Sequence, residues 1–244
     1  MRFALSFTTA LLCACTHAGP PAPEPSADAA VVVLLHGLAR SVSSMAPMAN
    51  ALRAEGYTVC NIAYPSREHS VAVLAADHVA PALARCSPDR ARPLHFVTHS
   101  LGGIIVRQLA ATGAVTAFGR VVMLSPPNQG SEVVDALSGW GLFRSVNGPA
   151  GSELGTAVVS LPQRLGPAPF ELGVIAGDHS INLVLSTIIP GADDGKVSVE
   201  HARLAGMKDF IVLPASHPFI MKDKAAIAQT VHFLKDGVFL HATD

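Results

Sequence analysis

Short apolar runs alternate with longer amphipathic stretches along most of the chain. Strands are predicted by six runs, at residues 30–35, 57–63, 93–98, 120–124, 171–176 and 210–214. Helices are predicted by the intervening stretches, at residues 43–55, 70–85, 101–112 and 222–235. Pro81 should kink or restart the second helix. The alternation predicts an α/β fold, a doubly wound, mostly parallel sheet of about six strands with helices on both faces.

The N-terminal residues have the pattern of a targeting segment. Residues 1–15 combine Arg2 with an apolar stretch too short to span a bilayer, which predicts a signal peptide. The sequence Leu-Cys-Ala-Cys ending at Cys15 resembles a bacterial lipobox, which implies lipidation of Cys15 and membrane attachment. We therefore expect an exported protein, either a bacterial envelope lipoprotein or, with a plain cleaved signal, a periplasmic or secreted one.

The rest of the chain divides into a tether and one domain. Residues 16–30 contain four prolines and predict an extended tether. Residues 31–244 predict a single globular domain. Within it, the Gly- and Pro-interrupted segment 131–169 predicts a cap, and we find no repeat and no second domain.

Charge and cysteine content exclude several classes of protein. The 244 residues include 17 Lys and Arg against 18 Asp and Glu, without a basic run, which argues against nucleic-acid binding. Eleven scattered histidines without an HExxH motif indicate no metal site. Cys60 and Cys86 lie outside any CxxC motif, so they form either one disulfide or two buried thiols.

A serine stands between the third predicted strand and the following helix. Gly102 lies two residues after Ser100, and Thr98 lies two residues before it, where Gly is commoner. A sharp strand-to-helix turn needs small residues at these positions so that strand and helix can approach. The helix N-terminus offers the free N–H of Leu101 to a developing oxyanion. This context indicates a nucleophile rather than a serine that only caps the helix.

The loop after the first predicted strand supplies a second oxyanion donor. We assign it to the N–H of Leu38, which follows His36 and Gly37. Gly37 lets the backbone turn close to the substrate, and we expect His36 to order the loop by hydrogen bonding. Together with His99, beside the nucleophile, His36 and Gly37 are predicted to bind substrate.

A base and an acid are expected after the serine, in the chain order Ser, Asp, His. His217 follows the last predicted strand, and this position favours it over the other downstream histidines, which are His179, His201, His232 and His241. For the acid, Asp193 and Asp194 lie in a tight turn that could direct a carboxylate at the imidazole. Asp178, just after the fifth predicted strand, is the rival.

In order along the chain, these motifs resemble the α/β-hydrolase fold, specifically small bacterial lipases and esterases. The motifs are LHGL at residues 35–38, THSLGG at 98–103, PPNQGS at 126–131, DDGKV at 193–197 and SHPF at 216–219. In those lipases the acid directly precedes the Gly of the Asp-Gly-x-Val turn, so the resemblance implies Asp194. It also implies an acyl-enzyme on Ser100, with His217 as the base and with no cofactor or metal.

The expected function is therefore hydrolysis of a small-molecule or lipid carboxylic ester, with no protein partner implied. A thioesterase or acyltransferase on the same fold is one alternative. A non-catalytic lipoprotein that binds a hydrophobic ligand is another, although the presence of Ser, Asp and His together counts against it. The apolar segment around Trp140, Leu142 and Phe143 is expected to be a lid, an acyl-binding wall or ordinary packing.

Overall fold

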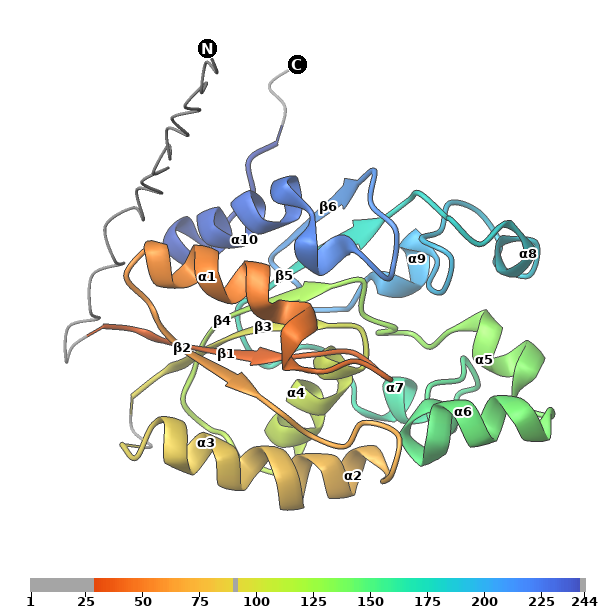
Figure 1. Cartoon of the computed structure of the whole chain (residues 1–244), viewed down its shortest axis with the longest axis horizontal. Helices are drawn as coiled ribbons and strands as arrows, with labels where there is room; N and C mark the ends of the chain where they lie inside the picture. Colours follow the sequence, from red (N-terminus) through yellow and green to blue (C-terminus); the bar gives the residue numbers. More distant parts are fainter. Residues whose placement is uncertain (1–28, 90–91, 242–244) are drawn as a thin grey trace, which may run out of the picture.

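The computed structural model describes residues 29–89 and 92–241 and is built on one parallel sheet (Figure 1). Its six strands are hydrogen-bonded in the order β2-β1-β3-β4-β5-β6. They are β1 (Val31–Leu35), β2 (Thr58–Ile62), β3 (Leu94–His99), β4 (Phe118–Leu124), β5 (Leu172–Gly177) and β6 (Asp209–Leu213). The predicted sheet is confirmed, because every strand lies within two residues of its predicted bounds. The expected signal peptide with Cys15, and the tether up to residue 28, lie outside the described residues.

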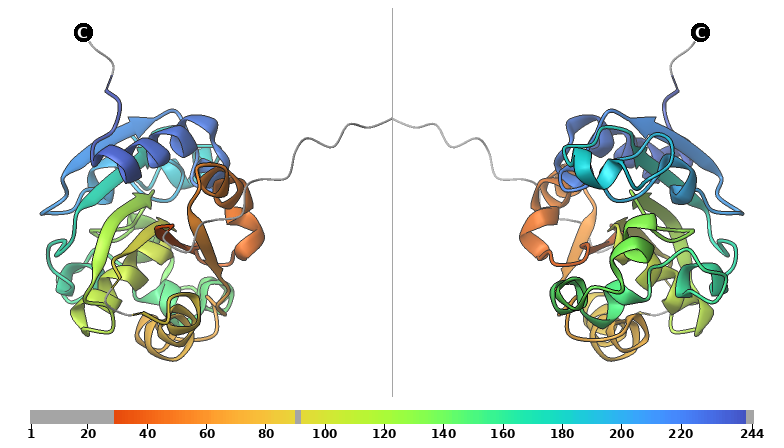
Figure 2. Two further views of the ribbon diagram at one scale, coloured as in Figure 1. Left: turned by 90° about the vertical axis from the view of Figure 1, so that its left-hand side faces the viewer. Right: turned by 90° about the vertical axis from the view of Figure 1, so that its right-hand side faces the viewer.

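Helices cover both faces of this sheet (Figures 1 and 2). One face carries η1 (Val42–Met45), α1 (Ala46–Ala54), η3 (Ile220–Lys222) and α10 (Lys224–Asp236). The other carries α2 (Val71–Val73), η2 (Leu74–Val79), α3 (Ala80–Cys86), α4 (Leu101–Ala111) and α9 (Val199–Ala202). None of the helices in residues 29–89 and 92–241 is long and apolar enough to cross a membrane.

The interior strand β1 shows why a strand of this sheet reads as a continuous apolar run. All five of its residues are buried. Val32 and Leu34 belong to the apolar cluster with α1 and α10, whereas Val33 and Leu35 belong to the cluster with α4 on the other face. Successive side chains of a strand point to opposite faces, so a strand covered on both sides needs apolar residues at every position.

The helical stretch that contains Pro81 is continuous rather than broken. A π-helical turn, η2, joins α2 to α3 and ends directly before the residues around Pro81. Proline lacks an N–H, and its ring clashes with the carbonyl four residues earlier in a regular α-helix. The wider π turn accommodates the ring, so the predicted irregularity at Pro81 takes this form.

The segment 131–169, predicted as a cap, contains α5 (Glu132–Leu137), α6 (Gly141–Ser152) and α7 (Leu161–Arg164). α6 is kinked at Gly148, where φ is 65°. After the kink it is tied to the body of the domain: the Ala150 N–H donates to the His69 carbonyl at 3.1 Å. A side chain at Gly148 would collide with the backbone carbonyl of Arg67, so only glycine fits there.

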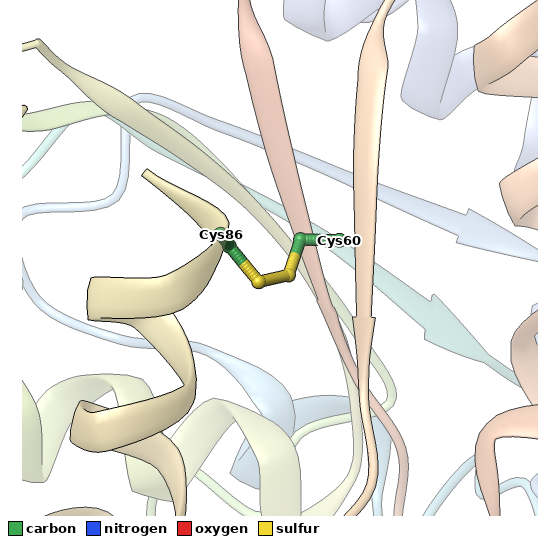
Figure 3. The surroundings of a disulfide bond; sticks show 2 residues. All are labelled: Cys60 and Cys86. Carbon is green, nitrogen blue, oxygen red and sulfur yellow. A yellow bond between two sulfur atoms is a disulfide. The ribbon is translucent and has the colours of Figure 1, made fainter. Parts of the chain in front are cut away.

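A disulfide joins Cys60 on β2 to Cys86 at the end of α3 (Figure 3). The sequence left a disulfide and two free thiols as alternatives, and the structure pairs the two sulfurs. Their Cα atoms are 6.0 Å apart, an ordinary separation for a disulfide. The bond ties the edge strand β2 to the helix that covers it.

Removal of this disulfide should lower stability without abolishing the fold. The two cysteines are 26 residues apart in sequence, and closing a loop of that size in the unfolded chain is worth about 3.5 kcal/mol. For a domain of this size, we expect the double variant Cys60→Ala, Cys86→Ala to melt about 10 °C lower. Under reducing conditions, the wild type should have the same melting temperature as the double variant. Equal melting temperatures for the oxidised wild type and the variant would contradict the expectation.

Candidate active site

Ser100 occupies a strained turn between β3 and α4, with φ 51° and ψ −119°. This left-handed conformation is unfavourable for a residue with a side chain, and such strain gathers at functional sites. The turn brings α4 against the end of β1 so closely that a Cβ at Gly102 would collide with the Leu35 carbonyl oxygen. The small residue two positions after Ser100 is therefore required by the backbone itself.

The structure brings Ser100, His217 and Asp194 together as one hydrogen-bonded chain. The Ser100 hydroxyl donates to His217 Nε2 over 3.0 Å, and His217 Nδ1 donates to Asp194 Oδ2 over 2.8 Å. All three residues are buried. Because a carboxylate only accepts hydrogen bonds, Asp194 fixes the imidazole tautomer that leaves Nε2 free to accept the serine proton.

The backbone around Asp194 favours its charged form. Its Oδ1 accepts the N–H groups of Lys196 and Val197 at 3.0 and 2.9 Å. Burial alone would raise the pKa of this carboxyl. The neighbouring His217 and the hydrogen bonds outweigh burial, so the pKa of Asp194 lies below its ordinary value. The His217 N–H also donates to the Asp194 carbonyl at 2.9 Å, which couples the two loops.

The other candidate acids lie elsewhere. Asp193 Oδ1 accepts the Gly195 N–H and the Ser186 hydroxyl, both at 2.7 Å, and so stabilises the turn. Asp178 is exposed to solvent. The remaining downstream histidines are placed away from Ser100. His179 is exposed to solvent. Each of the other three lies beside a different carboxylate: His201 is 3.0 Å from Glu132, His232 is 3.4 Å from Asp236, and His241 is 2.9 Å from Asp209.

The two predicted oxyanion donors lie in backbone positions suited to that task. Leu101 is the first residue of α4, so its N–H has no acceptor within the helix. Leu38 follows β1 in a tight turn, closed by the Arg40 N–H donating to the Gly37 carbonyl at 3.2 Å. Within residues 29–89 and 92–241, no protein acceptor is hydrogen-bonded to either N–H. Both donors remain available to a ligand.

His36 has a structural position. Its ring stacks on Tyr64 with 4.1 Å between centroids, and its Nδ1 donates to the Gly37 carbonyl at 2.9 Å. The Tyr64 hydroxyl donates to the His36 carbonyl. Burial lowers the pKa of His36 despite the opposing Gly37 hydrogen bond, so the ring is neutral. Neither His36 nor Gly37 lines the cavity beside Ser100, and their contact with substrate stays a prediction. The hydrogen bonds of His36 agree with its expected role in ordering the loop.

His99 lies at the cavity wall and supports His217. Its Nε2 donates to the His217 carbonyl over 3.0 Å. Burial, and then the neighbouring His217, hold the pKa of His99 well below its ordinary value, which keeps the ring neutral. A Cβ at Gly37 would lie within 2.5 Å of His99 Nδ1, so Gly37 is needed for the loop to pass this ring.

A cavity of about 410 Å³ opens beside Ser100, within the usual range for a small-molecule site. It lies beyond the carboxyl ends of the strands, on the side of the sheet where Figure 1 shows α5, α6 and α8 (Leu183–Ser186). Its wall is mainly apolar, formed by Leu38, Val133, Val134, Leu137, Val146, Leu154, Ile181 and Leu185.

The apolar wall differs from the one that the sequence suggested. Trp140 is 66% exposed and does not line the cavity. The side chains of Leu142 and Phe143 lie outside the described part of the structure. The wall comes instead from α5, from the two sides of the Gly148 kink and from α8. The helix α8 was not predicted, because its four residues are too few to show helical periodicity.

Several other residues at this site were missed from the sequence. Arg40 and Lys196 both line the cavity. The Ser131 hydroxyl donates to the Lys196 carbonyl at 2.7 Å and ties the start of the segment 131–169 to the loop with Asp194. Gly177 ends β5 where a Cβ would collide with the Ala215 carbonyl oxygen. The only available signals were the position of Arg40, two residues after Leu38, and the place of Lys196 within the DDGKV motif. Across the described ranges, no three His, Cys, Asp or Glu residues gather as a metal site.

Comparison with known proteins shows the fold. No family model and no curated protein matches the chain. Among solved structures it is similar to the mature Bacillus licheniformis lipase BlEst2, at 21% identity and TM-score 0.70 over 88% of this chain and 96% of that one. It also resembles the phospholipase PlaB from Legionella pneumophila, at 17% identity and TM-score 0.67 over 85% of this chain and 58% of PlaB.

A metagenomic carboxyl esterase, MGS0156, is similar at 20% identity and TM-score 0.59, over 82% of this chain and 68% of that one. These likenesses cover most of the chain. Together with the six-stranded parallel sheet and the turn at Ser100, they show that the protein has the α/β-hydrolase fold found in bacterial lipases and esterases.

Proposed function

We propose that this protein is a serine hydrolase that cleaves carboxylic esters through an acyl-enzyme on Ser100. The observation that carries the proposal is the hydrogen-bonded chain from Ser100 through His217 to Asp194, at the floor of an apolar cavity. Its distances of 3.0 and 2.8 Å are those required for proton transfer and for orientation of the base. A site built only to bind a ligand has no need of this chain.

Each group then has one role. Ser100 Oγ attacks the ester carbonyl while His217 Nε2 takes the hydroxyl proton, and His217 later delivers that proton to the leaving alcohol. Asp194 stabilises the charged imidazole. The N–H groups of Leu38 and Leu101 bind the oxyanion, and one such donor lowers the barrier by on the order of 3 kcal/mol. Water then attacks the acyl-enzyme while His217 takes a proton from it, and His217 returns that proton to Ser100 as the carboxylic acid leaves.

The acyl part of the substrate is proposed to lie along the apolar wall from α5, α6 and α8. Burial of an acyl chain against this wall supplies binding free energy of about 0.8 kcal/mol for each methylene removed from water. The names of the similar structures, which include a lipase, a phospholipase and a carboxyl esterase, support an ester substrate. The same chemistry would serve a thioester or an acyl acceptor other than water.

Hydrolysis of p-nitrophenyl esters, from acetyl to palmitoyl, tests the proposal together with an organophosphonate that labels activated serines. We expect hydrolysis with an optimum at a medium or long acyl chain, and one covalent adduct on the peptide that contains Ser100. Labelling without ester hydrolysis would move the function to a thioesterase or acyltransferase. A folded protein that shows neither labelling nor hydrolysis would contradict the proposal and favour a ligand-binding protein.

A further inference from the structure

The cavity beside Ser100 carries two positive charges that the proposed chemistry does not use. Arg40 and Lys196 both line it, and both are exposed to solvent. Desolvation and then the positive charge of Arg40 lower the pKa of Lys196, while the negative charge of Asp194 raises it. Two like charges held together at a cavity are unfavourable unless a third charge joins them.

No protein carboxylate neutralises this pair. Neither Arg40 nor Lys196 forms an ion pair within residues 29–89 and 92–241, although other exposed cations do, such as Lys208 with Glu171 and Lys235 with Glu55. Among the residues that the structure describes, Asp194 is the only acid that lines the cavity. Its carboxylate is already occupied by His217 and two backbone N–H groups.

Both cations are attached to the rigid loops of the active site. Arg40 lies two residues after Leu38, and its own N–H closes the turn to the Gly37 carbonyl at 3.2 Å. Lys196 lies two residues after Asp194; its N–H donates to that carboxylate at 3.0 Å and its carbonyl accepts the Ser131 hydroxyl at 2.7 Å. Both cations therefore start from backbone positions beside the proposed oxyanion donor and acid, which favours a ligand site near the reacting ester.

The cations also indicate which part of the substrate is charged. An acyl chain is apolar and suits the wall formed by α5, α6 and α8, where a charge would lose its hydration without compensation. The alcohol side of the ester is the remaining part, and it leaves from beside His217, in the loop that is bonded to the loop with Lys196. A guanidinium and an ammonium together match the oxygens of a phosphate or carboxylate.

We propose that Arg40 and Lys196 bind an anionic oxygen group on the alcohol part of the substrate, so that the preferred substrates are acyl esters of phosphorylated or carboxylated alcohols. This inference rests on the proposed ester hydrolysis and adds its substrate class. The cations select the substrate by its charge, and the apolar wall selects it by its acyl chain.

Two matched pairs of soluble hexanoyl esters test the inference. The phosphate pair is 1-hexanoylglycerol 3-phosphate and 1-hexanoylglycerol. The carboxylate pair is the hexanoyl ester of 4-hydroxybenzoate and that of its methyl ester. Short chains keep all four substrates dissolved as single molecules, so attraction to a charged lipid surface does not contribute. The measured quantity is the ratio of kcat/KM for the anionic ester to that for its neutral partner.

For the wild type we expect this ratio to be about ten or more in at least one pair, and to fall as salt is added. Arg40→Gln and Lys196→Gln should each lower the ratio about threefold, and the double variant should bring it near one. Lys196→Arg keeps the charge and should keep most of the preference. Arg53→Gln is the control, because it removes an exposed charge from α1 outside the cavity and should leave the ratio unchanged.

Selectivity for the phosphate pair alone would identify a phosphorylated alcohol, and selectivity in both pairs would identify a general anion site. A wild-type ratio near one in both pairs, or a ratio that the double variant leaves unchanged, would overturn the inference while ester hydrolysis stands. Equal losses on charged and neutral esters would also overturn it, because the cations would then act on the reaction itself. Absence of hydrolysis with all four esters, or hydrolysis that persists in Ser100→Ala, would instead reject the proposed function.

Discussion

Replacement of Ser100 by alanine should reduce kcat/KM for esters by about 10⁴- to 10⁶-fold while the protein stays folded. The loss is this large because no other nucleophile is in place: the hydroxyl of Ser100 is the group bonded to His217 Nε2, at 3.0 Å. Without it, His217 can at best activate water, and the oxyanion donors alone supply a small residual rate. Hydrolysis of p-nitrophenyl butyrate by the purified variant, with its melting curve alongside, measures both effects.

The backbone conformation at Ser100 suggests a second variant that separates loss of activity from loss of folding. Alanine keeps the Cβ and therefore the strain at φ 51°, so its melting temperature should stay within about 2 °C of the wild type. Glycine adopts this conformation without that penalty, so Ser100→Gly should be equally inactive and more stable by about 1 kcal/mol. An inactive variant that is also unfolded would not count, and two folded variants that keep activity would reject Ser100 as the nucleophile.

Asp194→Asn should lower kcat by about 10⁴-fold with little change in structure. The amide oxygen can still accept the N–H groups of Lys196 and Val197, which lie 3.0 and 2.9 Å from Oδ1. The amide nitrogen would then face His217 Nδ1 and donate to it. That tautomer places a hydrogen on Nε2, toward Ser100, so the imidazole can no longer take the serine proton.

The matched control is Asp178→Asn, which makes the same chemical change at an exposed carboxylate. We expect the control to hydrolyse esters at a rate within about twofold of the wild type, since surface changes of this kind have small effects. The assay is the steady-state rate with saturating ester at fixed pH. A larger loss in Asp178→Asn than in Asp194→Asn would transfer the role of the acid to Asp178.

The sheet and the placement of the serine could be predicted because their signals are local. Each strand shows as a mainly apolar stretch of five to seven residues, and the turn at Ser100 needs only its immediate neighbours. The choice between Asp178, Asp193 and Asp194 did not follow from the residues alone. It depends on where the loop after α8 folds back, and only the resemblance to lipases pointed to Asp194.

The cavity wall could not be predicted for a related reason. Trp140 is the largest apolar residue in its segment, yet it faces solvent, whereas the smaller Val133, Val134 and Leu137 on α5 line the cavity. Size and hydropathy do not reveal which face of a short helix turns inward when it has only two turns. The direction of α6 depends on the kink at Gly148, and that glycine is required by the distant Arg67 carbonyl.

The strand order β2-β1-β3-β4-β5-β6 has a consequence for the order in which the protein can assemble. Once β1, β2 and β3 are paired, every later strand adds to the same growing edge in the order of synthesis. The strands of the N-terminal half can thus pair with one another without any strand of the C-terminal half. His217 follows β6, which is the last strand to join the sheet in this order. The hydrogen bond between Ser100 and His217 can therefore form only after β6 has joined. Catalytic competence would then arise only when the whole sheet is complete, and an unfinished chain would carry the nucleophile without its base.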